Sequence, residues 1–188
     1  MNKILLITGG SRGIGAATAY LAAAQGYAVA VNYSHNACAA EVVVRAIQAQ
    51  GGKAMAVQAD VANEAQVLAM FATVDAKLGR LTALVNSAGV VDVAARVDAM
   101  DVARWRRLFD INVIGTMLCA REAVRRMSTR HGGSGGAIVN LSSVAATLGS
   151  PGQYVDYAAS KGAIDSFTVG LGREVVPRGF ASTRCARA

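Results

Sequence analysis

Short apolar runs alternate with longer amphipathic segments along most of this chain. Apolar runs at residues 3–7, 27–32, 53–58, 81–86 and 137–141 have the length and composition of buried strands. Amphipathic segments at 13–25, 37–50, 64–78 and 101–129, and another that ends near residue 176, have helical periodicity. Because parallel strands need a crossover between them, usually a helix, the alternation predicts an α/β fold built on a parallel sheet.

A glycine-rich turn, Thr8-Gly9-Gly10-Ser11-Arg12-Gly13-Ile14-Gly15, joins the first apolar run to the first helix. Glycines permit a tight turn here and let backbone N–H groups approach a pyrophosphate at the helix N-terminus. Glycine turns between a strand and a helix also occur for steric reasons alone. The spacing here differs from the familiar dinucleotide-binding motif G-x-G-x-x-G. Between an apolar strand and an amphipathic helix, it predicts a cradle for a dinucleotide phosphate.

Tyr157 and Lys161 stand four residues apart in the segment Tyr157-Ala158-Ala159-Ser160-Lys161. On a helix this spacing places a phenol and an ammonium group on one face, within reach of a shared ligand. A phenol is a weak proton donor near neutral pH, and a neighbouring cation stabilises its phenolate. A tyrosine in this setting can act as the general acid of a carbonyl reduction. Together with the glycine turn, the pair predicts a nicotinamide-dependent oxidoreductase.

The chain resembles the classical short-chain dehydrogenase/reductase family from residue 3 to about residue 179. The matching positions are residues 8–15, Asp60-Val61, Asn86-Ser87-Ala88-Gly89, Asn112, Ser142-Ser143, Tyr157 and Lys161. The family more often has a second asparagine where Ser87 stands. The resemblance implies a Rossmann-type doubly wound parallel sheet with helices on both faces, in a single dinucleotide-binding and catalytic domain over residues 1–179.

The resemblance assigns catalytic roles to four residues. Tyr157 would donate or accept the proton, and Lys161 would bind the nicotinamide ribose and stabilise the phenolate. Asn112 would hold a water in the proton relay. Ser143 would hydrogen-bond the substrate carbonyl or hydroxyl, in preference to Ser142, because the second serine of this pair usually faces the cleft. Taken singly, the serines can also be polar residues at a strand end, and Asn112 a turn residue inside a helix.

Cofactor contacts are also implied by the resemblance. They fall on Thr8, Gly9, Ser11, Arg12, Gly13, Ile14, Gly15, Asn32, Ser34, Asp60, Val61, Asn86, Ala88, Gly89, Tyr157 and Lys161. Asp60 would hydrogen-bond the adenine, with Val61 against the ring, although an Asx turn explains Asp60 nearly as well.

The end of the second strand bears on the choice of cofactor. An acidic residue there would bind the free ribose hydroxyls of NAD and repel a 2′-phosphate, but the chain reads Asn32-Tyr33-Ser34-His35-Asn36. The guanidinium of Arg12, inside the glycine turn, can reach a phosphate. These features predict NADP(H) over NAD(H). The substrate that we expect, from the tyrosine–lysine pair, is a small carbonyl or alcohol compound.

Composition narrows the other partners. The formal net charge of +7 does not indicate a nucleic-acid protein, because the arginines are scattered apart from short clusters in amphipathic helices at 104–107 and 125–126. The three cysteines and two histidines lack metal-ligand spacing, so we expect no metal site. With neither a bilayer-length apolar run nor a signal-peptide pattern, we expect a cytoplasmic protein with no membrane partner. The resemblance implies a homodimer or homotetramer, with the helices at 101–129 and 155–176 in the interface.

Residues 181–188 do not continue the pattern, since they show neither strand alternation nor helical periodicity. A family-like continuation would read Arg-Val-Asn-Ala-Val-Arg-Pro-Gly. When this peptide is written in GC-rich codons and the first base is deleted, the new reading frame translates as Ala-Ser-Thr-Arg-Cys-Ala-Arg-Ala. That is the sequence of residues 181–188. We therefore expect an aberrant tail, from truncation or a frameshift, and a sheet that lacks its last strands. A short natural tail is the alternative. A non-catalytic remnant that at most binds nucleotide stays open beside the oxidoreductase.

Overall fold

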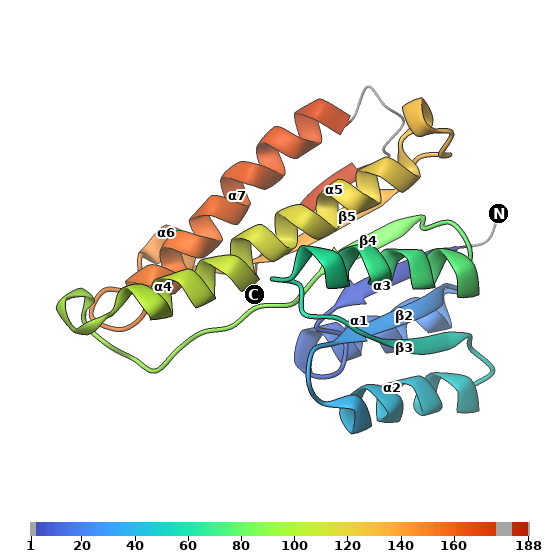
Figure 1. Ribbon diagram of the computed structural model, residues 1–188, viewed down its shortest axis with the longest axis horizontal. Helices are drawn as coiled ribbons and strands as arrows, with labels where there is room; N and C mark the ends of the chain where they lie inside the picture. Colours follow the sequence, from blue (N-terminus) through green and yellow to red (C-terminus); the bar gives the residue numbers. More distant parts are fainter. Residues whose placement is uncertain (1–2, 176–181, 188) are drawn as a thin grey trace.

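A six-stranded parallel sheet organises the part of the chain that this computed structural model describes, residues 3–175 and the backbone of 182–187 (Figure 1). The strands are β1 (Ile4–Thr8), β2 (Ala28–Tyr33), β3 (Ala54–Gln58), β4 (Ala83–Asn86), β5 (Ala137–Ser142) and β6 (Ser182–Arg187). Their order is β3-β2-β1-β4-β5-β6, and every neighbouring pair is parallel. This order confirms the predicted Rossmann-type, doubly wound sheet.

Helices cover both faces of the sheet. The α-helices are α1 (Gly13–Ala24), α2 (Ala37–Ala49), α3 (Glu64–Lys77), α4 (Val102–Phe109), α5 (Gly115–Met127), α6 (Ala145–Leu148) and α7 (Val155–Val175). Shorter turns are η1 (Val97–Ala99), η2 (Asp110–Ile114) and η3 (Thr129–His131). Helices α1 and α2 pack on one face, whereas α3, α5 and the end of α7 pack on the other. Figure 1 shows α4, α6 and the start of α7 gathered at one end of the molecule, away from α2 and β3.

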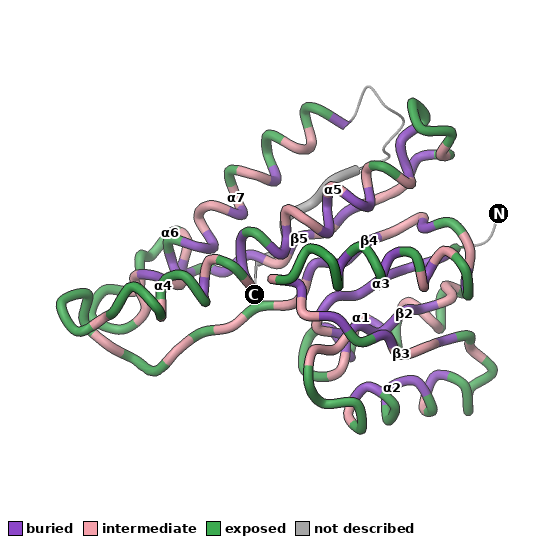
Figure 2. Tube along the Cα trace, viewed as in Figure 1, coloured by how far each residue is buried: buried purple, intermediate pink, exposed green. Residues whose placement is uncertain are grey.

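The two faces explain the mostly apolar character of the central strands. Along β1, Leu5 and Ile7 pack toward α1 and α2, whereas Ile4 and Leu6 pack toward α3 and α5. A strand that is covered on both faces is mostly apolar, and the buried polar residues Thr8, Asn32 and Asn86 lie toward the carboxyl ends of β1, β2 and β4. Figure 2 shows the resulting buried layer along the strands.

Asparagine and aspartate side chains cap the N-termini of three helices, α2, α3 and α4. Asn36 Oδ1 accepts a hydrogen bond from Ala39 N at the start of α2, and Asn63 Oδ1 accepts one from Gln66 N at the start of α3. Asp101 Oδ1 does the same for Arg104 N at the start of α4. Each cap satisfies a backbone donor that has no partner within its helix. The predicted cap at Asn63 is confirmed.

The structure corrects two expectations. The single helix expected at 101–129 is divided into α4 and α5 by the π-helical turn η2, which contains the buried Asn112. The expectation that no strand follows α7 is also wrong, because the backbone of β6 pairs with β5 from Ala137–Ser182 to Ser142–Arg187. A ladder is made by backbone groups and needs no alternation of side chains, and pairing removes an exposed edge from β5.

Candidate functional site

A cavity of about 580 Å³ opens at the carboxyl ends of the strands. It lies where the strand order reverses between β1 and β4, which is where open α/β sheets bind ligands. The predicted site residues that line it are Gly9, Ser11, Arg12, Gly13, Ile14, Asn32, Ser34, Asp60, Val61, Ala88, Gly89, Tyr157 and Lys161. Thr8, Gly15, Asn86, Asn112 and Ser143 are not among the lining residues. The fold therefore brings the glycine turn and the Tyr157–Lys161 pair to the two ends of one cavity.

Steric requirements fix the glycines of the turn between β1 and α1. Gly9 has φ +63°, and a Cβ there would lie 2.9 Å from Ala88 Cα. A Cβ at Gly15 would lie 2.4 Å from the carbonyl oxygen of Gly9. Arg12, at the start of α1, makes no side-chain cap to the helix. The first backbone N–H groups of α1 thus stay available to an anion, and the positive end of the helix dipole favours one.

Two predicted residues, Thr8 and Asn32, hold the backbone of the turn in place. Thr8 Oγ1 accepts hydrogen bonds from Ser87 N and Ala88 N, each at 3.1 Å. Asn32 Oδ1 accepts one from Gly9 N at 3.2 Å, and its amide donates to Ala59 O at 3.0 Å. These buried contacts tie the turn after β1 to the ends of β2, β3 and β4. Thr8 and Asn32 therefore hold the shape of the cavity wall.

Asn86 forms part of a buried amide chain behind the cavity. Its Nδ2 donates to Asn140 Oδ1 at 2.9 Å, and Asn140 Nδ2 donates to Thr168 Oγ1 at 2.9 Å. The chain links β4, β5 and α7. Asn86 thus helps to hold β4 and β5 against α7, the helix that carries Tyr157 and Lys161.

The far end of the cavity is lined by the segment after β2 and by Asp60. Asp60 Oδ1 accepts a hydrogen bond from Ala62 N at 3.0 Å, which is the Asx turn that the sequence suggested. Asp60 is the one acidic residue among the described residues that line the cavity. His35, Asn36 and Ala39 also line it. These three residues were not among the predicted cofactor contacts, although the sequence had shown that the segment after β2 contains no carboxylate.

Tyr157 and Lys161 stand together at the other end. Lys161 Nζ donates to Leu141 O at 2.7 Å and lies 5.7 Å from the centre of the Tyr157 ring. The lysine is only 7% exposed, and a Cβ at Gly89 would approach its Nζ to 3.7 Å. The end of β5, the turn after β4 and one face of α7 therefore hold an ammonium group beside a phenol.

Asn112 connects η2 to two neighbours rather than to the cavity surface. Its Oδ1 accepts from Val90 N at 2.8 Å, and its Nδ2 donates to Val90 O at 2.9 Å and to Ser160 Oγ at 3.2 Å. Ser160 Oγ in turn donates to Tyr157 O at 2.7 Å. Asn112 is thus hydrogen-bonded to the loop after β4 and, through Ser160, to the helix turn of Tyr157.

The two serines at the end of β5, Ser142 and Ser143, have different surroundings. Ser142 lines the cavity, and its hydroxyl donates to Lys161 O at 3.4 Å. Ser143 is buried at the start of the α6 turn, where its Oγ accepts a hydrogen bond from Ala145 N at 3.2 Å. Val90, Val91, Ile111 and Leu141, which the sequence did not single out, complete this end.

Other candidate groups do not form a site. Cys119 is fully buried, and burial raises the pKa of its thiol to about 12, so it stays protonated as a core residue. Within the described ranges, no three His, Cys, Asp or Glu side chains come together in a way that could hold a metal ion. Among the helices of those ranges, none is both long and apolar enough to cross a membrane.

A family model described as short chain dehydrogenase matches residues 3–186 of the chain. The chain belongs to the short-chain dehydrogenase family. The match continues past residue 179 and through most of β6. The family assignment that the sequence motifs suggested is thereby confirmed.

Relatives and solved structures agree with this short-chain dehydrogenase assignment. An uncharacterized oxidoreductase, YgfF of Escherichia coli, is 54% identical over 98% of this chain and 74% of its own length. A 3-oxoacyl-[acyl-carrier-protein] reductase of Synechocystis is 40% identical over 94% of this chain and 70% of its own length. A short chain dehydrogenase from Burkholderia cenocepacia, crystallised in complex with NADP, superposes with a TM-score of 0.89 at 37% identity, over 96% of this chain and 71% of its own. The chain is therefore an oxidoreductase by family.

Proposed function

We propose that the chain transfers a hydride between NADP(H) and a carbonyl or alcohol substrate. The observation that carries this proposal is a single cavity with an uncapped helix N-terminus at one end and Tyr157 beside Lys161 at the other. A dinucleotide has its phosphates and its reactive ring at separated positions, and the cavity offers suitable groups for each.

The cofactor fits the groups that line this cavity. The glycine turn leaves no room for a Cβ at Gly15, and the first turn of α1 offers N–H groups to the pyrophosphate. Asp60, Val61 and Lys161 line the cavity; in this proposal the first two contact the adenine and Lys161 binds the nicotinamide ribose. When bound, the nicotinamide ring supplies or accepts the hydride.

Tyr157 would carry the proton in this proposal. In the reductive direction the carbonyl carbon gains the hydride, and its oxygen takes the phenol proton, so the product is an alcohol. The ammonium group of Lys161 stabilises the phenolate that is left. Asn112 would contribute to the relay that returns a proton to the tyrosine.

Ser143 stays our assignment for orienting the carbonyl oxygen. Its Oγ accepts a hydrogen bond from Ala145 N, so its own proton is available to the substrate. The hydroxyl of Ser142 instead donates to Lys161 O. Ser143→Ala should lower kcat by about 10²-fold or more, as the loss of a donor to a developing oxyanion does, and Ser142→Ala should lower it less. The reverse order would assign the role to Ser142.

The preference for NADP(H) rests on charge at the far end of the cavity. Arg12, Ser34, His35 and Asn36 line that end, and its one acidic residue, Asp60, follows β3 rather than β2. A 2′-phosphate there meets a guanidinium and polar groups without a repelling carboxylate from β2. The NADP bound to the Burkholderia structure supports the same choice. Titration with NADPH and NADH should give a clearly lower Kd for NADPH; equal values would remove the preference.

The reaction itself is tested by NADPH oxidation with a panel of ketones, aldehydes and a 3-oxoacyl thioester, the last because one relative is a 3-oxoacyl-[acyl-carrier-protein] reductase. Matching alcohols with NADP⁺ test the other direction. Turnover of any member supports the proposal. Cofactor binding without turnover in either direction would favour the non-catalytic, nucleotide-binding alternative.

A homodimer or homotetramer in the cytoplasm remains part of the proposal, and light scattering tests the assembly.

A further inference from the structure

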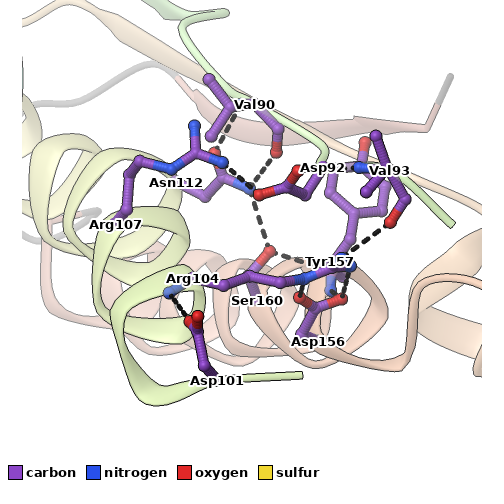
Figure 3. A network of polar contacts seen from close by, with 10 residues as sticks. All are labelled: Val90, Asp92, Val93, Asp101, Arg104, Arg107, Asn112, Asp156, Tyr157 and Ser160. Carbon is purple, nitrogen blue, oxygen red and sulfur yellow. Dashed lines mark hydrogen bonds and ion pairs between the residues drawn. The ribbon is translucent and has the colours of Figure 1, made fainter. Parts of the chain in front are cut away.

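Arg104 joins three separate segments beside the proposed proton donor (Figure 3). Its Nε donates to Asp156 Oδ2 at 2.6 Å, and its Nη2 donates to Asp156 Oδ1 at 3.2 Å. Its Nη1 donates to the carbonyl oxygen of Val93 at 2.7 Å. One guanidinium thus bridges α4, the loop after β4 and the first turn of α7.

The ion pair is buried and fully charged. The side chains of Arg104 and Asp156 are 10% and 3% exposed. The hydrogen bonds from Arg104 hold the pKa of Asp156 below its ordinary value, and the same contact raises the pKa of Arg104. Asp156 Oδ1 also accepts from Tyr157 N at 2.9 Å, and a carboxylate is favoured at a helix N-terminus. The pair is therefore directly coupled to the backbone of Tyr157.

The loop after β4 is held at three successive points. Asn112 makes two hydrogen bonds to the backbone of Val90, Arg107 pairs with Asp92, and Arg104 holds Val93. Val90 and Val91 line the cavity beside Tyr157. Because Arg104 holds both this loop and the start of α7, it fixes the distance between the cavity wall and the helix that carries the phenol.

We propose that Arg104 is a positioning residue. It holds the loop at residues 90–93, of which Val90 and Val91 line the cavity, in register with Tyr157 through Asp156. The inference rests on the proposed reduction only for its kinetic consequence; the positioning itself is independent of it. A misplacement of the acid of about 1 Å can cost on the order of 10²-fold in rate. Lysine cannot reproduce the effect in full, because an ammonium group lacks the planar fork that meets two carboxylate oxygens and a carbonyl.

The kinetic test compares Arg104→Met and Arg104→Lys with a matched control, Arg126→Met. Arg126 also makes an arginine–carboxylate pair, to Asp75 at 2.7 Å, is 18% exposed, and lies on α5 at the other end of the sheet. We expect Arg104→Met to lower kcat about 10- to 100-fold with little change in the Kd for NADPH. Arg104→Lys should restore part of the rate. Arg126→Met should lower thermal stability but leave kcat near the wild-type value.

Hydrogen exchange tests the positioning without any turnover. Arg104→Met should speed amide exchange in peptides that cover residues 89–96 and 154–162, whereas peptides that cover 3–33 should exchange as in the wild type. If the wild type consumes no NADPH, the proposed function fails, and this exchange pattern alone decides the inference. Unchanged exchange in both peptides would overturn it. A wild-type kcat in a folded Arg104→Met variant would overturn it as well.

Discussion

Gly15→Ala is the substitution with the most direct steric consequence at the proposed phosphate cradle. The added Cβ would lie 2.4 Å from Gly9 O and 3.0 Å from Gly10 Cα. Both neighbours are backbone atoms, so no side chain can rotate away, and the turn or the start of α1 must shift. Overpacking of this kind costs about 1–3 kcal/mol. Alanine also has a higher helix propensity than glycine, by about 1 kcal/mol, which offsets part of the cost.

Gly170→Ala separates these two contributions. Gly170 lies within α7, and apart from its chain neighbours and the nearby backbone of its own helix, no described atom lies within 4 Å of its ideal Cβ. This variant receives only the gain in helix propensity. The free energies of unfolding of the two variants should therefore differ by about 1–3 kcal/mol, with Gly15→Ala the less stable.

Urea unfolding of both variants measures this difference, and a titration with NADPH measures the effect on the cradle. A shift of the turn should also raise the Kd for NADPH at least about tenfold in Gly15→Ala, which corresponds to about 1.4 kcal/mol. The Kd of Gly170→Ala should stay at the wild-type value. If Gly15→Ala is as stable as Gly170→Ala and binds NADPH equally well, the steric reasoning is refuted.

Three further outcomes follow from the charges and the burial. Folding lowers the pKa of Asp156, so its ion pair stabilises the folded chain fully above the ordinary aspartate pKa, and this stabilisation is lost as the pH falls through the lowered value. Below about pH 4, the free energy of unfolding should therefore depend less steeply on pH in Asp156→Asn than in the wild type. Exposed Cys38 should react with a thiol reagent in the native state, whereas buried Cys119 should react only after unfolding. Peptide mapping locates the label, and labelling of Cys119 in the native state would contradict its burial. Arg12→Met should raise the Kd for NADPH by about tenfold, as expected when a phosphate contact is lost, and leave that for NADH nearly unchanged; equal effects would exclude a 2′-phosphate contact.

The sequence predicted most of the fold because the fold depends mainly on burial. Strands covered on both faces are mostly apolar, so β1, β2 and β4 stand out as short apolar runs. Turn chemistry was also visible, since Asp60 and Asn63 form the Asx turn and the cap expected of them. Local signals of this kind survive in a single sequence.

The errors concern features that depend on tertiary contacts. The π-helical turn at Asn112 arises where its side chain binds the Val90 backbone, and helical periodicity alone does not reveal such an insertion. The β6 ladder is made by backbone groups along the edge of β5, and a pattern of side chains does not reveal such pairing. Arg104 and Asp156 are 52 residues apart, and only the packing of α4 against α7 brings them together.

The candidate site was predicted where motif and geometry coincide. Most of the glycine turn lines the cavity, as do Tyr157 and Lys161. Thr8 and Asn86 lie behind the wall, where Thr8 accepts from the backbone of Ser87 and Asn86 donates to the Asn140 side chain, and their contact with the cofactor stays a prediction. A motif marks a position as belonging to the site, whereas the distinction between contact and support requires the distances.

The most direct test of the central proposal is a comparison of the wild type with Tyr157→Phe in NADPH-dependent reduction of a carbonyl substrate. Phenylalanine keeps the ring beside Lys161 and removes only the hydroxyl that would carry the proton. Turnover should fall by at least about 10²-fold, the range attributed to general acid catalysis, while the Kd for NADPH changes little. Turnover at the wild-type rate in Tyr157→Phe would contradict the assignment of this tyrosine as the acid.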